Sequence, residues 1–142
     1  MGNLTKNLSR SEFACRCGCG FDTADVVLVP VLQQCADHFA AVDGCNVRIK
    51  ITGPNRCLAH NEMVQKEAKP NYIPFTSKSQ HLYARAVDFK LFNRDTGDQI
   101  DPDRVADYLD DTYPASFGIG RYSNRTHFDT RTNDPARWDV RS

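Results

Sequence analysis

The sequence predicts an α+β domain in which a small antiparallel sheet is flanked by helices. Apolar side chains recur at helical spacing over residues 29–42 and again after Asp101, which indicates two helices. Apolar and polar side chains alternate over residues 47–51 and 86–92, which indicates two strands. A hairpin of two further strands is indicated over residues 117–131.

The first elements follow from residues with strong positional preferences. Residues 1–24 are predicted to form a loop-rich N-terminal cap. In the helix over residues 29–42, Pro30 fits the first turn and Gly44 ends the helix. A short helix is expected over residues 58–66. The apolar stripe of the first helix, which we assign to the core, consists of Leu32, Cys35, Phe39 and Val42.

The later elements have equally clear boundaries. Asp101 is a suitable cap for the second helix, and Pro102 occupies its first position. Ser123 and Asn124 join the two hairpin strands, and the tail around Trp138 is expected to pack back on the domain. The apolar face of the second helix consists of Val105, Tyr108 and Leu109.

The composition argues against several classes of protein. A chain of 142 residues with 40% hydrophobic and 25% charged residues suits one domain over residues 1–142, and we expect a monomer. Lys plus Arg equals Asp plus Glu at 18 each, which gives no basis for binding nucleic acid or an anionic membrane. No run is apolar enough to cross a bilayer, and no secretory signal opens the chain, so we expect it to be cytoplasmic as synthesised.

Two histidines and an aspartate form the most informative pattern in the chain. His81 lies in a loop before the strand over residues 86–92, Asp88 lies within that strand, and His127 lies in the hairpin. Each residue alone would more often be an ordinary polar residue, but pairing of the two strands would bring all three to one metal. Two imidazoles, one carboxylate and one open position form the ligand plan of a catalytic zinc site.

Four blocks of the chain carry recognisable motifs. They are residues 8–20 with a Cys-x-Cys-x-Cys run, 51–61 with an arginine, 79–88 with the first histidine and aspartate, and 118–138 with His-x-Asp. Together they resemble the zinc D-alanyl-D-alanine carboxypeptidase family, which includes phage L-alanyl-D-glutamate endolysins and shares a fold with the hedgehog signalling domain. The resemblance is to a phage-type branch, and it implies a hedgehog-like fold with Zn²⁺ as the cofactor.

The resemblance implies a role for each of several residues. His81, Asp88 and His127 would be the zinc ligands. Arg56 would bind a carboxylate of a peptidoglycan stem peptide, unless it forms a structural salt bridge. Ser79 would bind a substrate carboxylate or orient His81, unless it only caps its loop.

Two positions depart from the family pattern. Residues 53–56 read Gly-Pro-Asn-Arg where relatives usually carry Ser-Gly-Tyr-Arg, and Asn124 stands where many relatives have an acidic general base. Asp129 is the candidate substitute for that base, and its alternative role is to orient a ligand histidine. Arg131, on the same predicted face as Asp129, is a second candidate for the substrate carboxylate.

The expected function is zinc-dependent hydrolysis of amide bonds in peptidoglycan stem peptides. The enzyme would act as a D,D-carboxypeptidase or as an endopeptidase at an L-alanyl-D-glutamate or crosslink bond. It would be phage-encoded and would reach the cell wall by lysis or through a separate pore. The alternative is a non-catalytic zinc domain that binds muropeptides or serves as a phage structural component.

Six cysteines are many for a cytoplasmic chain. Cys15, Cys17 and Cys19 alternate, and Cys57 and His60 form a Cys-x-x-His pair. The pattern leaves three interpretations open, which are a structural zinc site of three cysteines and one histidine, disulfides formed after release, and reduced packed thiols. Reduced thiols are the default among them.

Overall fold

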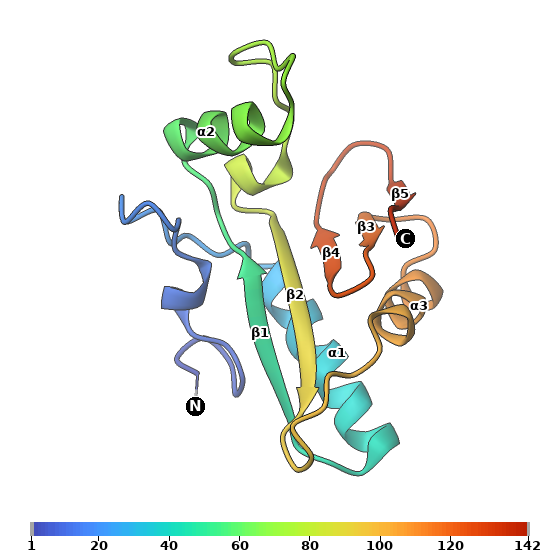
Figure 1. Ribbon diagram of the computed structural model, residues 1–142. Helices are drawn as coiled ribbons and strands as arrows, with labels where there is room; N and C mark the ends of the chain where they lie inside the picture. Colours follow the sequence, from blue (N-terminus) through green and yellow to red (C-terminus); the bar gives the residue numbers. More distant parts are fainter. Residues whose placement is uncertain (1, 142) are drawn as a thin grey trace.

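Five strands form one mixed sheet in the order β1-β2-β4-β3-β5, with the helices α1 and α3 on one face (Figure 1). The computed structural model describes residues 2–141. The helical elements are η1 (Arg10–Phe13), α1 (Leu28–Asp43), α2 (Leu58–Ala68), η2 (Gln80–Tyr83) and α3 (Pro102–Thr112). The strands are β1 (Val47–Gly53), β2 (Ala86–Asn93), β3 (Gly118–Arg121), β4 (Thr126–Asp129) and β5 (Ala136–Asp139).

The predicted helices are confirmed, together with the signals that bound them, but Val42 of the first apolar stripe is exposed and does not belong to the core. Gly44 ends α1 in the left-handed conformation with φ 61°, which an L side chain rarely adopts. Asp101 caps α3, because its carboxylate accepts a hydrogen bond of 2.9 Å from the backbone N–H of Asp103. None of the helices in residues 2–141 combines the length and the hydropathy that a membrane span requires.

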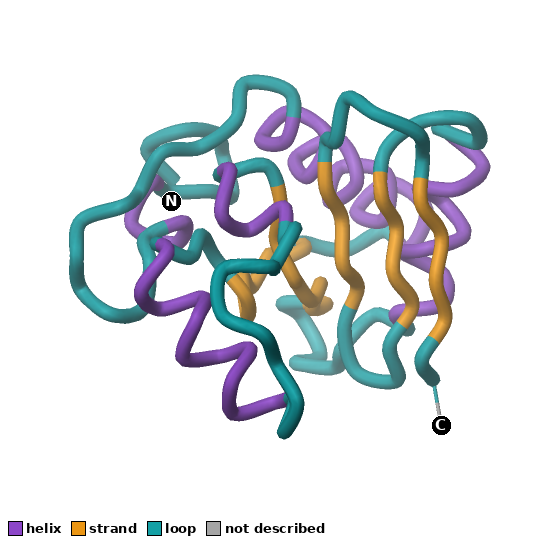
Figure 2. Tube along the Cα trace, turned by 90° about the horizontal axis from the view of Figure 1, so that it is seen from above, coloured by secondary structure: helices purple, strands orange, loops and turns teal. Residues whose placement is uncertain are grey.

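The sheet departs from the prediction at its C-terminal edge. The pairs β1–β2, β2–β4 and β4–β3 are antiparallel, but β5 pairs with β3 in parallel. The chain crosses from β4 to the far side of β3 before β5 begins, so β5 runs in the direction of β3 (Figure 2). The predicted antiparallel pairing is confirmed for β1 to β4, whereas β5 adds a parallel edge strand, through which the tail around Trp138 packs back on the domain.

The alternation in β2 separates the core from the face that carries the polar residues. Val87, Phe89 and Leu91 are buried against α1 and α3, whereas Asp88 between them points to the opposite face and is only partly buried. β4 pairs with β2 so that His127 lies directly opposite Asp88. The strand pairing on which the predicted triad depends is therefore present.

Candidate metal centre

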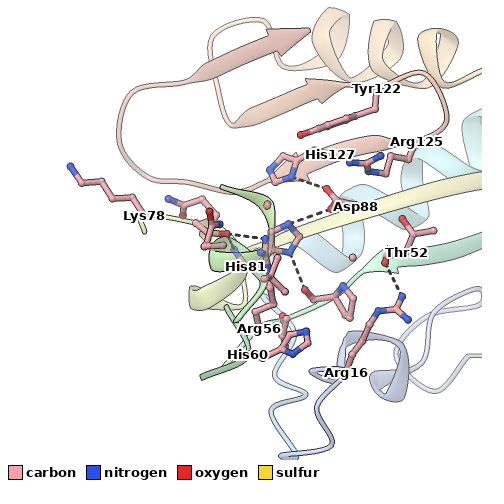
Figure 3. Close-up of a pocket in the computed structure, with 18 of the residues that line it drawn as sticks. Arg16, Thr52, Arg56, His60, Lys78, His81, Asp88, Tyr122, Arg125 and His127 are labelled. Carbon is pink, nitrogen blue, oxygen red and sulfur yellow. Dashed lines mark hydrogen bonds and ion pairs between the residues drawn. The ribbon is translucent and has the colours of Figure 1, made fainter. Parts of the chain in front are cut away.

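Three side chains from three elements converge on one point at the end of the sheet. His81 comes from η2, Asp88 from β2 and His127 from β4, and their ligand atoms all lie within 4.8 Å of one another (Figure 3). Asp88 stands between the rings, with Oδ2 at 3.6 Å from His81 Nε2 and Oδ1 at 2.9 Å from His127 Nδ1. The sequence-predicted ligand set is thus brought together by the fold.

The second nitrogen of each ring has its own partner, which fixes the nitrogen that is left for a metal. His81 Nδ1–H donates to the carbonyl oxygen of Pro54 at 2.9 Å, so Nε2 faces Asp88. His127 Nε2–H donates to Asp129 Oδ2 at 2.7 Å, so Nδ1 faces Asp88. Such outer hydrogen bonds are typical of metal-binding histidines, because they set the tautomer and the ring orientation.

Asp88 is held in its anionic form, as a metal ligand must be. Burial alone would raise the pKa of Asp88, but hydrogen bonds with His127 and His81 outweigh it and hold the pKa well below its usual range. For His127, burial alone would lower the pKa, but hydrogen bonds with Asp129 and Asp88 outweigh burial and raise the pKa. The donor set of one carboxylate and two imidazoles fits a divalent cation such as zinc, which on binding would displace the proton that Asp88 favours on His127 Nδ1.

The three residues lie in a cleft of about 610 Å³ whose walls are strongly basic. The described residues that line it include a single carboxylate, Asp88. Six basic side chains line it as well: Arg16, Arg56, Lys69, Lys78, Arg125 and Arg131. Because the whole chain has no net charge, this concentration of positive charge is a property of the cleft.

The family model described as peptidase M15 matches residues 6–129, which is most of the chain. The chain belongs to the peptidase M15 family. The sequence-predicted zinc D-alanyl-D-alanine carboxypeptidase family is thereby confirmed, and the chain is a peptidase by family. The searches of curated proteins and of solved structures returned no match.

M15 peptidases are metal dependent, and the donor set of this M15 domain agrees with that property. The position at which many relatives carry an acidic base does not contribute to the cleft. Asn124 is exposed in the turn between β3 and β4, where its Oδ1 accepts a hydrogen bond of 3.1 Å from Arg125. A proton acceptor in this M15 domain would have to come from another residue.

Asp129, the predicted substitute for that base, is fully buried and surrounded by donors. Arg131 donates from Nε to Oδ1 and from a terminal nitrogen to Oδ2, each at 2.7 Å, while His127 donates to Oδ2. Burial alone would raise the pKa of Asp129, but these hydrogen bonds hold it well below its usual range. A carboxylate with both oxygens engaged favours the orienting role over the role of base. The same contacts occupy Arg131.

Arg56 and Ser79 form the wall of the cleft beside His81. A terminal nitrogen of Arg56 donates to Ser79 Oγ at 3.2 Å, and Ser79 Oγ also accepts the backbone N–H of His81 at 3.3 Å. Burial lowers the pKa of Arg56, and within residues 2–141 no carboxylate forms an ion pair with it. The structural salt bridge considered for Arg56 is absent from this described part of the chain, and its charge faces the cleft.

Two aromatic residues that the sequence analysis did not assign to the site complete it. The Trp138 ring lies 4.7 Å from the His127 ring, and its Nε1–H donates to the hydroxyl of Tyr122 at 3.0 Å. Both residues line the cleft. The signal in the sequence was their place in the C-terminal motif block, but the parallel pairing of β5 that brings Trp138 to His127 has no local signature.

Glycines opposite the polar side chains leave the space that the site needs. A Cβ atom on Gly118 would overlap the carboxylate of Asp129, and one on Gly53 would overlap that of Asp88. Each glycine lies on the strand next to that of its aspartate, directly opposite the carboxylate that it accommodates. The sheet is therefore closely fitted around Asp88 and Asp129.

Replacing Gly118 by alanine is expected to displace Asp129 and so to free the His127 ring. Loss of such an outer partner typically lowers metal affinity by about 10- to 100-fold, which competition with a chromophoric chelator measures. Gly97→Ala is the control, because it strains a positive φ of 82° while a Cβ there meets no atom within 4 Å. Gly97→Ala should lower the stability of the protein and leave its metal affinity unchanged. Equal metal affinities in the two variants would contradict the inference that Gly118 makes room for Asp129.

Proposed function

We propose that this M15 domain uses zinc to hydrolyse amide bonds in peptidoglycan stem peptides. The observation that carries the proposal is a three-ligand group, His81, Asp88 and His127, in a cleft lined by basic side chains. Stem peptides carry free carboxylates on several residues, so a positively charged cleft is complementary to them. A bound zinc ion would supply Lewis-acid chemistry, activating water and polarising the scissile carbonyl.

Side chains around the predicted ligands orient them and enclose them. Asp129 keeps the proton on His127 Nε2, so that Nδ1 is free to act as a ligand, and Arg131 keeps Asp129 anionic. Trp138 covers one side of His127 and limits the access of bulk water. These contacts support an orienting role for Asp129, with catalysis depending on it through His127.

Arg56 is our assignment for the residue that binds the substrate carboxylate. Its guanidinium is partly desolvated and, within residues 2–141, bonded only to neutral Ser79 Oγ, so a carboxylate would gain a charge-assisted partner there. Arg131 is less suited, because its fork already holds Asp129. Ser79 then has two tasks, which are to cap η2 and to hold Arg56 in place.

Arg56→Gln is expected to raise KM for a peptide with a free carboxylate by about 10- to 100-fold, the equivalent of a hydrogen bond to a charged group. The same variant should treat a substrate with the matching carboxamide almost as the wild type does, because that substrate never used the charge. Arg94→Gln, just beyond the C-terminal end of β2 and outside the cleft, is the control. An equal loss on both substrates would show that Arg56 acts structurally.

The decisive test of the function is digestion of purified peptidoglycan, with mass spectrometry of the released fragments. Zinc-loaded protein should produce new fragments, and protein stripped with a chelator should produce them only after zinc is restored. Release of terminal D-alanine would identify a D,D-carboxypeptidase, whereas cleavage after L-alanine or at a crosslink would identify an endopeptidase. A folded, zinc-loaded protein that yields no fragments would contradict hydrolysis and favour a muropeptide-binding or phage structural role.

A further inference from the structure

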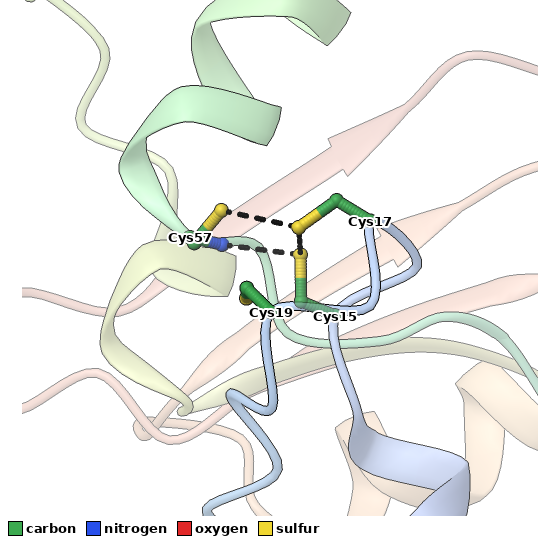
Figure 4. A group of neighbouring side chains, drawn as sticks. All are labelled: Cys15, Cys17, Cys19 and Cys57. Carbon is green, nitrogen blue, oxygen red and sulfur yellow. Dashed lines mark hydrogen bonds between the residues drawn. The ribbon is translucent and has the colours of Figure 1, made fainter.

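Four cysteines lie together outside the cleft, on the surface where the N-terminal loop meets α2. Cys15, Cys17 and Cys19 belong to the loop that follows η1, and Cys57 immediately precedes α2 (Figure 4). Their sulfur atoms all lie within 4.8 Å of one another. Cys17 Sγ is 3.4 Å from Cys15 Sγ and 3.5 Å from Cys57 Sγ.

We propose that Cys15, Cys17, Cys19 and Cys57 bind a second metal ion, a structural zinc. Zinc–thiolate bonds of about 2.3 Å in a tetrahedron place the sulfurs about 3.8 Å apart, which is close to the separations found here. Four sulfur ligands leave no open position, so such a site is structural and cannot bind substrate. The proposal is independent of the activity assigned to the cleft.

The position of these thiols argues against ordinary packing. A free cysteine that serves only as a small apolar group is usually buried, as Cys35 is in the core of this chain. Cys17 and Cys19 are exposed and Cys57 is partly exposed, so three of the four sulfurs gain little from packing. A bound cation explains why these three thiols gather around the buried thiol of Cys15.

The backbone around the sulfurs is shaped to support this arrangement. Gly18 and Gly20 have φ values of 81° and 88°, which let the loop turn back so that alternate cysteines face the same point. The backbone N–H of Cys57 donates to Cys15 Sγ at 3.4 Å, and that of His60 donates to Cys57 Sγ at 3.4 Å. Such N–H donors stabilise the thiolate form that a metal requires.

The geometry also distinguishes this site from the alternatives that the sequence left open. A zinc site of three cysteines and one histidine would need the His60 ring, but that side chain lines the cleft and Cys57 supplies the sulfur instead. A disulfide joins one pair of sulfurs at about 2.05 Å, whereas Cys17 Sγ is almost equally far from the sulfurs of Cys15 and Cys57, at 3.4 and 3.5 Å. Convergence of all four sulfurs on one point is what a single metal ion requires.

The site would fasten the N-terminal loop to a wall of the cleft. Cys57 directly follows Arg56, and the loop makes further contacts nearby, since Arg16 donates to the carbonyl of Thr52 at 2.7 Å and Asn55 N–H donates to that of Phe13. A metal bound to the cysteines would therefore help to hold Arg56, the residue that directly precedes Cys57. We expect its loss to lower the melting temperature and to expose residues 14–20 to proteolysis.

Metal counting by native mass spectrometry tests the proposal on the full chain loaded with Zn²⁺. The wild type should hold two zinc ions, and Cys17→Ser and His81→Ala should each hold one. Cys45→Ser, a partly buried cysteine outside the cluster, is the matched control and should hold two. Retention of both ions by Cys17→Ser, or a single ion in the wild type that His81→Ala loses, would overturn the proposal.

Two further measurements do not depend on the folding of a cysteine variant. His81→Ala loaded with Co²⁺ should show the intense near-ultraviolet thiolate-to-cobalt absorption of a four-sulfur site, and its absence would overturn the proposal. Alkylation of the unfolded, chelator-treated wild type without reductant should modify all 6 cysteines. A lower count would show disulfides in place of metal ligands.

Discussion

His81→Ala is expected to abolish hydrolysis of peptidoglycan and to remove the metal from the cleft. The variant deletes one of three ligands, and the remaining pair, Asp88 and His127, would lie 2.9 Å apart and satisfy one another. Loss of a Lewis acid that contributes several kcal/mol corresponds to a fall in turnover of about 10³-fold or more. Fragment release and the metal content of the same sample measure both effects.

His38→Ala is the matched control for that experiment. His38 belongs to α1 and stacks on Tyr108 at 4.1 Å between ring centroids, away from the cleft. Its removal should leave turnover and metal content at wild-type values. Full activity in His81→Ala, with a metal still bound in the cleft, would remove His81 from the ligand set.

Asp129→Asn is expected to weaken metal binding more than it slows the hydrolytic step. The amide keeps the shape of the side chain but loses the charge that holds the proton on His127 Nε2. We expect metal affinity to fall about 10- to 100-fold, and activity to recover largely when the metal is in excess. Chelator competition and a metal titration of turnover give the two quantities.

The opposite pattern would restore Asp129 to the role of base. Unchanged metal affinity with turnover reduced by about 10²- to 10⁴-fold at saturating metal is what removal of a general base produces. Asp110→Asn is the control, since it breaks only the surface ion pair between Asp110 and Arg137. It should change neither quantity.

The convergence of His81, Asp88 and His127 could be predicted from the sequence because local patterns carry it. Alternation around Asp88 and around His127 gave each residue its face, and one strand pairing joined them. The helix bounds at Gly44 and Asp101 were predictable for the same reason, since caps act through neighbours in the chain. The structure places these elements close to the predicted residues.

The remaining features depend on contacts between distant segments. The pairing of β5 with β3 brings Trp138 to His127, and nothing in the tail itself indicates a parallel partner. The crowding of donors around Asp129 needs the positions of Arg131 and of Gly118 on the next strand. The fourth sulfur, Cys57, is far from the other three in sequence, so only the folded chain selects it over His60.

Because β2 pairs with β4, the alignment of Asp88 with His127 depends on packing in the hydrophobic core. Phe128 is fully buried between His127 and Asp129, which point to the other face. A slip of one residue would turn Phe128 into the cleft and both polar residues into the core, at a large cost in free energy. Apolar packing therefore disfavours misaligned strands whether or not a metal is bound, and it fixes the relative positions of Asp88 and His127.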